Sequence, residues 1–248
     1  MRILFLSLVA VGAFAQAQSV PRAADGKPDL SGTWQGFGVS ITGEKGAPPL
    51  HPLPPTKYRP PARQPIPYQD WAAAKSKTFT VLDDPTSKCL LPGVPRIVSM
   101  PMPLEIVQTP KEVVILYEAF RAFRRIPLND KLQHPDDLTP TWMGDSVGKW
   151  DGDTLVVDVT GFNDKTWISG QGTIHTDKLH VVEKYRRNED DTISYEASVE
   201  DPGALTKPWV TGSVLRKPVD VRVEEYECIE NNPDNDHIKK AIELQTKR

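Results

Sequence analysis

The segment HTDKLHVVEKYRR, residues 175–187, has the two-residue alternation of a β-strand that is buried on one face. One face should meet water, because its members are His180, Val182, Lys184 and Arg186. The opposite face should meet the interior, and it carries Leu179, Val181, Glu183 and Tyr185. A buried carboxylate needs a partner, a proton or a chemical role, so this strand raises the question of what Glu183 does.

Similar segments fill the chain from Glu112 to Cys228. They are EVVILYE, RAFRRIP, SVGKW, DTLVVDVTGF, DKLHVVEKYRR, TISYEASVE, WVTGSVLR and VDVRVEEYEC. Asp151-Gly152 favours a two-residue hairpin, and residues 188–191 supply a second tight reversal. Short connections make successive strands antiparallel neighbours. We therefore predict an all-β fold, an antiparallel meander that closes into a barrel of about eight to ten strands, with a two-sheet sandwich as the alternative.

The amino-terminal segment PDLSGTWQGFG, residues 28–38, bears on this choice. Its Gly32-x-Trp34 resembles the first strand of lipocalin-like barrels, in which the Trp fills the base of the barrel. The alternative is a Trp that packs in a β core of any kind. The motif therefore favours a lipocalin-like barrel only weakly.

Residues 1–17 have the features of a secretory signal peptide. Arg2 precedes an apolar run from Ile3 to Phe14, and small-residue cleavage patterns end at Ala15 or Ala17. No second apolar run of about 18 residues follows, so we predict a periplasmic or secreted protein without membrane insertion after cleavage. Residues 18–248 should form a single domain. Their formal charge is −4, because the chain's −3 loses the positive charge of Arg2, and without a long basic block nucleic acid is not an expected partner.

Residues 48–67 contain nine of the 24 prolines, which favours an extended strap over a helix or a sheet strand. Its apolar and aromatic residues suggest that it lies against the domain, and a mobile linker is the alternative. YQDWAAAKSK, residues 68–77, is predicted to be a short helix. A second short helix is predicted over IKKAIELQ, with Asp236 as its cap.

Cys89 and Cys228 are the two cysteines of the chain. In the oxidising space outside the cytoplasm such a pair forms a disulfide, and we expect one bridge. Two buried, unpaired thiols are the alternative, because the sequence does not show whether the two Cβ atoms meet.

Partners for Glu183 are sought on neighbouring strands. His175 has the same parity but would lie roughly 26 Å away along one strand, so a contact requires a folded-back loop near residues 170–172. Arg121 and Arg125 share a parity with Phe123 in RAFRRIP, so both are candidates to point inward. A buried Arg–Glu pair would be structural. The functional alternative has the same pair lining a pocket, or Glu183 acting as a general base.

The segment LQHPDDLTPTWMGDSVGKW, residues 132–150, is a polar loop that enters a strand. A loop with a histidine, carboxylates and aromatic rings suits ligand recognition at a barrel mouth, and its candidates are His134, Asp136, Asp137, Trp142, Asp145 and Trp150. The alternative is that the three aspartates are turn residues.

Metal binding and serine hydrolysis are weaker hypotheses. His134, His175, His180 and Glu183 include zinc-ligand types, but no His-x-His or His-Glu-x-x-His pair occurs, so we expect no metal and no other cofactor. Gly144-x-Ser146-x-Gly148 has the spacing of a nucleophile elbow. It precedes an Asp-Gly hairpin, however, whereas such an elbow joins a strand to a helix.

Several motifs together resemble a family of secreted, β-rich, lipocalin-like proteins of soil bacteria. They are Pro28-Asp29-Leu30-Ser31-Gly32-x-Trp34, Cys89 with Pro92-Gly93-x-Pro95-Arg96, Gly144-x-Ser146-x-Gly148-x-Trp150, Gly152-Asp153-Thr154-Leu155-Val156-Val157, His175, Glu183, Asp201-Pro202, and Cys228 with Glu230-Asn231. The resemblance covers nearly all of the mature chain, and Asp151 stands where the pattern favours Glu. It supports one domain and the pairing of Cys89 with Cys228, favours Glu183 and His175 as site residues, and implies no particular activity.

The leading functional hypothesis is a barrel that binds a small, partly apolar organic molecule. Its expected ligand-binding residues are Arg121, Arg125, Trp142, Trp150 and Tyr185. The alternative is an acid/base isomerase, lyase or hydrolase that uses Glu183 or Asp145 with His134 or His175. A third possibility is an interaction module whose proline strap docks on a cell-envelope partner.

Overall fold

The computed structural model describes residues 19–36, 51–62, 64–170 and 172–230. The predicted signal peptide and the predicted helix after Asp236 lie outside these residues, as do residues 48–50 and 63 of the predicted strap. The strands are β1 (Gly32–Gly36), β2 (Pro103–Gln108), β3 (Glu112–Tyr117), β4 (Phe123–Pro127), β5 (Asp145–Asp151), β6 (Thr154–Thr160), β7 (Trp167–Ser169), β8 (Thr173–Ile174), β9 (His180–Arg187), β10 (Thr192–Glu200) and β11 (Trp209–Arg216). The helices are α1 (Asp70–Ser76) and the 3-10 helices η1 (Val81–Asp83), η2 (Pro85–Lys88), η3 (Arg96–Ser99) and η4 (Ala119–Arg121).

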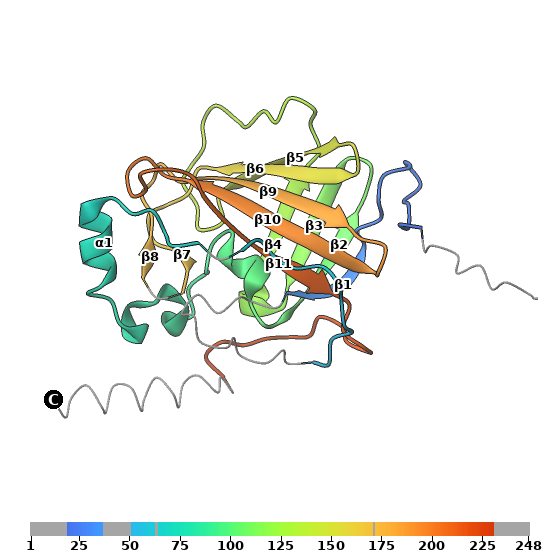
Figure 1. Cartoon of the computed structure of the whole chain (residues 1–248), viewed down its shortest axis with the longest axis horizontal. Helices are drawn as coiled ribbons and strands as arrows, with labels where there is room; N and C mark the ends of the chain where they lie inside the picture. The colour runs from blue at the N-terminus through green and yellow to red at the C-terminus, as the bar shows by residue number, and fades with distance from the viewer. Residues whose placement is uncertain (1–18, 37–50, 63, 171, 231–248) are drawn as a thin grey trace, which may run out of the picture.

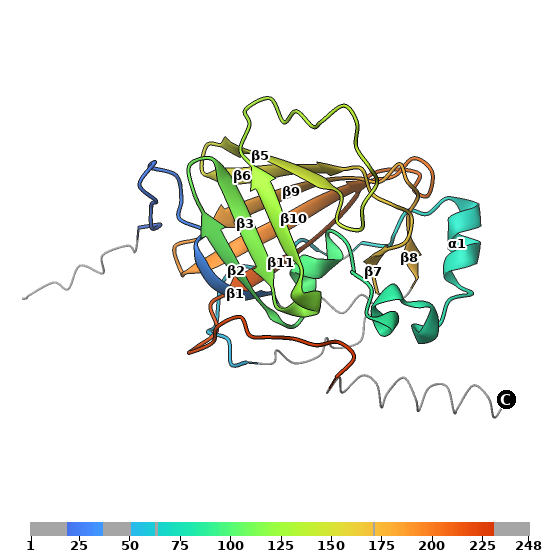
Figure 2. The same cartoon turned by 180° about the vertical axis from the view of Figure 1, so that it is seen from behind.

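Nine strands form one antiparallel sheet that is nearly closed into a barrel (Figures 1 and 2). Their order is β4-β3-β2-β1-β11-β10-β9-β6-β5, so β1 joins the first and last parts of the meander. The two ends of the sheet, β4 and β5, approach each other beside a parallel bridge between Leu128 and Gly148. There the Asn129 N–H donates to the Gly148 carbonyl at 2.7 Å. The predicted antiparallel barrel is confirmed.

Seven of the eight predicted strand segments contain a strand of this sheet, and the eighth, VDVRVEEYEC, is wrong. Residues 217–228 form no strand, although their alternation fits one. The preceding strand, β11, pairs with β10 along its whole length and with β1 at Leu215 and Arg216. The alternation of residues 219–228 is therefore not enough to place them in the sheet. The hairpin between β5 and β6 is confirmed, and its turn uses Gly152 at a φ of +56°, which glycine adopts without strain.

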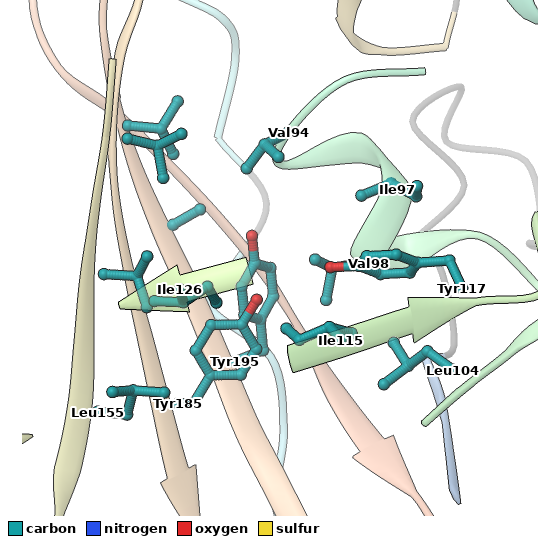
Figure 3. Close-up of a cluster of buried hydrophobic side chains, with 14 of the residues drawn as sticks. Val94, Ile97, Val98, Leu104, Ile115, Tyr117, Ile126, Leu155, Tyr185 and Tyr195 are labelled. Carbon is teal, nitrogen blue, oxygen red and sulfur yellow. The ribbon is translucent and has the colours of Figure 1, made fainter. Parts of the chain in front are cut away.

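The inward faces of these strands form one apolar core. Figure 3 shows Tyr185, Tyr195, Ile115 and Leu155 together, and Val94 and Val98 from the η3 region reach the same cluster. Trp34 is also buried there, and its indole N–H donates to the Leu30 carbonyl at 2.8 Å. The inward position predicted for Trp34 is therefore confirmed.

The proline strap lies against the barrel, as expected. The Trp209 indole N–H donates to the Gln64 carbonyl at 3.2 Å, and Thr56 donates to Asp190 at 2.6 Å. The predicted helix is also confirmed as α1. It lies beside the small β7–β8 sheet at one end of the barrel in both views (Figures 1 and 2).

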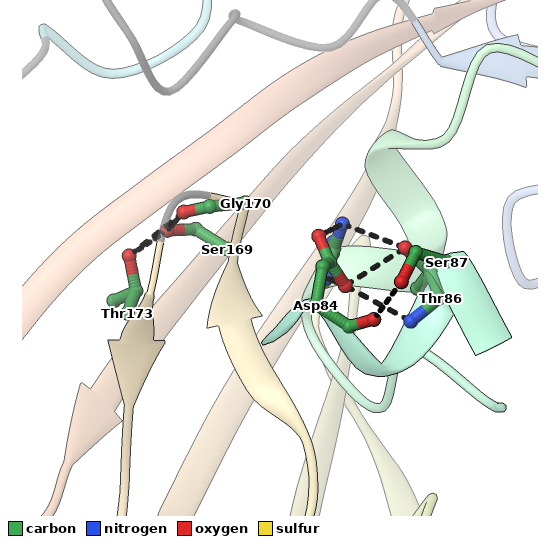
Figure 4. Close-up of polar contacts among 7 residues, drawn as sticks. Asp84, Thr86, Ser87, Ser169, Gly170 and Thr173 are labelled. Atoms are coloured by element: carbon green, nitrogen blue, oxygen red, sulfur yellow. Dashed lines mark hydrogen bonds and ion pairs between the residues drawn. The ribbon is translucent and has the colours of Figure 1, made fainter. Parts of the chain in front are cut away.

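Cys89 and Cys228 form the predicted disulfide, which joins positions 139 residues apart. The same region is fixed by Asp84, whose carboxylate caps η2 at Thr86 and accepts two hydrogen bonds from Arg96, at 2.7 and 2.8 Å. Figure 4 shows the contacts of Asp84, together with those among Ser169, Gly170 and Thr173 that tie β7 to β8. Among the described residues, no helix has both the length and the apolar character needed to cross a membrane.

Candidate functional site

Glu183 lies inside the barrel on β9, where it has no exposed surface. Its partner is Arg124 on β4, which is 4% exposed. Nη2 of Arg124 donates to Oε2 at 2.6 Å and Nη1 donates to Oε1 at 3.2 Å. The hydroxyls of Tyr185 and Tyr195 donate to the same Oε1, at 3.0 and 2.8 Å. The buried carboxylate is thus paired with a cation and accepts four hydrogen bonds.

The ion pair also links the two ends of the sheet. Nη2 of Arg124 on β4 donates to the Ser146 hydroxyl on β5 at 2.8 Å. Ser146 is buried within a strand, so it is not the exposed serine of a nucleophile elbow. Because β4 and β5 are the sheet's end strands, the Arg124 side chain holds the barrel together where backbone pairing is sparse.

The expectation that Arg121 and Arg125 point inward is wrong. Both are exposed, and their carboxylate partners are Glu227 at 2.8 Å and Glu112 at 2.7 Å, respectively. Phe120 and Arg121 have positive φ angles in η4, so the strand alternation begins only at β4. Phe123, the first residue of β4, is 66% exposed. Because side chains alternate between the two faces of the strand, the next residue, Arg124, points into the barrel.

The surroundings of Glu183 favour a structural role. Burial raises the pKa of Tyr117 to about 12 and raises the pKa values of Tyr185 and Tyr195 well above the ordinary value, so these hydroxyls stay protonated near neutral pH. Tyr185 is predicted to bind ligand, but its hydroxyl donates a hydrogen bond to Glu183. A carboxylate without accessible surface touches neither bulk solvent nor a water-sized void, so this part of the barrel interior is filled.

His134 and Asp145 do meet, but they do so away from Glu183. His134 Nδ1 lies 2.6 Å from Asp145, and its Nε2 lies 2.9 Å from Asp158, whose other oxygen is 2.8 Å from His180 Nε2. His134 thus bridges two carboxylates, one on β5 and one on β6. The hydrogen bond to Asp158 raises the pKa of His180. The group is an ionic clamp that ties the loop before β5 to strands β5, β6 and β9.

The other residues predicted from this loop do not gather around the clamp. Asp136 and Asp137 are exposed, Trp142 is half-buried, and Trp150 packs against the barrel core. Among the described residues, no group of three or more His, Cys, Asp or Glu side chains is arranged to hold a metal ion.

His175 lies in a cleft between α1 and the segments around β7 and β8, with a volume of about 550 Å³. We call it the His175 cleft. Its aromatic walls are Trp71, Phe79, Phe162 and Trp167, and its charged side chains are Lys75, Asp164 and Asp177. The rings of Phe79 and Trp167 lie 5.3 Å apart, and Trp71 is 47% exposed. The cleft therefore combines an apolar wall with ionic groups.

His175 is held on both sides of its ring and is 4% exposed. Nδ1 lies 2.8 Å from the Thr176 carbonyl, which only accepts, so Nδ1 carries the hydrogen. Nε2 of the neutral ring then accepts from the Thr166 hydroxyl at 2.6 Å. Burial lowers the pKa of His175, against the Thr176 hydrogen bond and the charges of Asp201 and Asp164. His175 is thus a neutral, fixed part of the cleft.

The backbone beneath the cleft is packed closely. Thr166 faces Gly93, where a Cβ atom would lie 2.7 Å from the Thr166 hydroxyl oxygen and the φ angle is +75°. Thr176 donates its N–H and its hydroxyl to Asp201, the latter at 2.7 Å. These contacts hold the polar floor of the cleft in one position.

Sequence reasoning found His175 but missed the aromatic walls. The walls come from two segments that lie far apart in the sequence, residues 71–79 and 162–167, and no periodicity joins them. The one available signal was GFNDKTW, residues 161–167, which places two aromatic residues around Asn163 and Asp164 between predicted strands.

Two other hollows have different linings. One of about 280 Å³ lies between the strap and β11, with Ile66, Tyr68 and Trp209 on its walls and no charged side chain. Another of about 820 Å³ borders residues 219–224, His51 and Glu118, and has no aromatic ring apart from His51. No protein-family model and no curated protein sequence matches the chain.

Proposed function

We propose that the protein binds a small, partly apolar organic molecule in the His175 cleft. The observation that carries the proposal is the meeting of four aromatic rings with polar and charged groups in a space of about 550 Å³. Small-molecule sites commonly have volumes of about 300–1,000 Å³, apolar and aromatic walls, and a few polar groups that orient the ligand. The Cys89–Cys228 disulfide and the predicted signal peptide support a periplasmic or secreted location for this binding.

The interior of the barrel is a poorer place for a ligand. Glu183 has no exposed surface, and Arg124, Tyr185 and Tyr195 surround it. A ligand there would have to displace these side chains and break a buried ion pair, which costs several kcal/mol, about 3 to 5, when one partner is lost. The His175 cleft requires no such rearrangement.

The same geometry favours binding over acid/base catalysis by the four predicted residues. Glu183 faces the barrel interior, His175 faces the cleft, and His134 and Asp145 form the separate ionic clamp. Both ring nitrogens of His175 already have partners, so proton transfer to a ligand would first break one of these bonds. The strap packs along β11, which leaves less of its polyproline surface for a cell-envelope partner.

A neutral fluorescent probe tests the proposal. N-phenyl-1-naphthylamine should bind the wild type with a rise in emission, and Trp71→Ala should weaken its affinity about tenfold, since an aromatic pair contributes about 0.5–1.5 kcal/mol beyond the buried area. Phe123→Ala is the matched control, because Phe123 is an even more exposed aromatic side chain on the outer face of the barrel. Equal affinity in Trp71→Ala and wild type, or no binding to wild type, would overturn the proposal.

A further inference from the structure

The charged groups of the His175 cleft are unbalanced. Asp164 and Asp177 contribute two carboxylates and Lys75 contributes one ammonium group. Across the described ranges, no hydrogen bond or ion pair engages either of these two carboxylates, so both are available to a ligand. A third carboxylate, Asp201, lies buried behind Thr176 and adds to the negative potential at His175.

The aromatic wall adds a second, independent preference. The indole of Trp71 is anchored by a hydrogen bond of 2.9 Å from its N–H to the Gly203 carbonyl, while about half of the side chain stays exposed. The face of an indole attracts cations through its quadrupole, more strongly than the other aromatic side chains do. A neutral His175 places no opposing charge on the floor.

We propose that the ligand of the His175 cleft is a small organic ammonium ion, whose charge lies near Trp71 between Asp164 and Asp177. This inference rests on the proposed binding function and adds the charge of the ligand. An anionic ligand would face two carboxylates with Lys75 as its one counter-charge in the cleft, and a neutral ligand would lack the charge–charge attraction to either carboxylate. The positive charge of Lys75 should weaken the binding of a cation in the cleft.

Choline and 3,3-dimethylbutan-1-ol are suitable probes, because they have similar shapes and differ in the charge of the central atom. Displacement of N-phenyl-1-naphthylamine at low salt should show that choline binds wild type about tenfold more tightly than the alcohol, since cation–π and surface charge contacts contribute about 0.5–1 kcal/mol each. Added sodium chloride should weaken choline and leave the alcohol unchanged.

Three variants assign the effect to the cleft. Asp164→Asn with Asp177→Asn should weaken choline about tenfold without changing the alcohol, whereas Asp136→Asn with Asp137→Asn, in an exposed loop, should change neither. Lys75→Gln should strengthen choline about threefold, which misfolding would not produce.

The outcomes separate the two proposals. If the alcohol displaces the naphthylamine as well as choline does, or if choline is insensitive to the Asp164 and Asp177 changes, the charge assignment is overturned and the binding function stands. If the naphthylamine itself does not bind in a Trp71-dependent way, both proposals are overturned.

Discussion

Arg124 on β4 reaches across the barrel interior to Glu183 on β9, with Nη2 and Oε2 2.6 Å apart. These strands are not neighbours in the sheet, since β5 and β6 follow β9 towards the open end. The same nitrogen holds Ser146 on β5, so one side chain connects three strands around the incomplete seam of the barrel. The buried carboxylate found in the alternating pattern of residues 175–187 is therefore part of the closure of the fold.

Glu183→Gln should reduce the free energy of unfolding by about 3 to 5 kcal/mol, because Arg124 would remain buried without a counter-charge. Denaturant titration measures this. Glu112→Gln removes the carboxylate that pairs with the exposed Arg125 and should cost about 1 kcal/mol or less. Equal stability of Glu183→Gln and wild type would show that Glu183 is not required to close the barrel.

Reduction of the Cys89–Cys228 disulfide should lower the free energy of unfolding by about 3 to 5 kcal/mol, because the bridge constrains a long loop in the unfolded chain. The bridge joins positions 139 residues apart. Denaturation with and without dithiothreitol provides the comparison. A Cys89→Ala, Cys228→Ala double variant should match the reduced protein and ignore the reductant, and a reductant effect on that variant would point to another cause.

His180 should stabilise the fold at acidic and neutral pH and lose this effect in alkali. Its hydrogen bond to Asp158 raises its pKa above the ordinary 6.5, so the folded state holds the proton more tightly than the unfolded state. The contribution is complete below about pH 6.5 and disappears as the pH rises through the higher folded pKa. The stability difference between wild type and His180→Gln should shrink from about pH 6 to about pH 9, and a constant difference would contradict the ionic clamp.

His175 should have the opposite dependence. Burial lowers its pKa below 6.5, so the unfolded state binds the proton first as the pH falls. The free energy of unfolding should therefore decline as the pH falls from about 6.5 to the folded pKa of His175. This decline should be weaker in His175→Asn, in which the amide N–H can replace the hydrogen bond to the Thr176 carbonyl. An identical acid limb in the two proteins would mean that His175 is not held as a neutral ring.

The fold was largely predictable from alternation in the sequence. Val181, Glu183 and Tyr185 face the interior as the two-residue period required, and Gly152 marked a hairpin because few residues accept its φ angle. The strand expected at residues 219–228 shows the limit of such patterns. Alternation indicates that a segment fits a β-strand, but it does not specify which strand the segment would pair with.

The candidate site was less predictable. The partner of Glu183 was assigned to Arg121 or Arg125 because Phe123 was expected inside, yet η4 shifts the phase and exposes Phe123. The aromatic walls of the His175 cleft depend on how α1 packs beside β7 and β8, which local sequence does not specify. His175 stands out in the sequence because it shares the parity of Glu183 and belongs to the motifs of the resemblance, yet the structure places it in the cleft, apart from Glu183.

Binding in the His175 cleft is tested by following the indole N–H signals of the six tryptophans by NMR during titration with N-phenyl-1-naphthylamine. Trp71 and Trp167 line the His175 cleft, Trp34 lies in the barrel core, and Trp209 lies beside the strap. Binding in the cleft predicts that the Trp71 and Trp167 signals move together in a saturable way while those of Trp34 and Trp209 stay in place. Movement of the Trp34 or Trp209 signal with a stationary Trp71 signal would place the ligand in the barrel or under the strap and contradict binding in the His175 cleft.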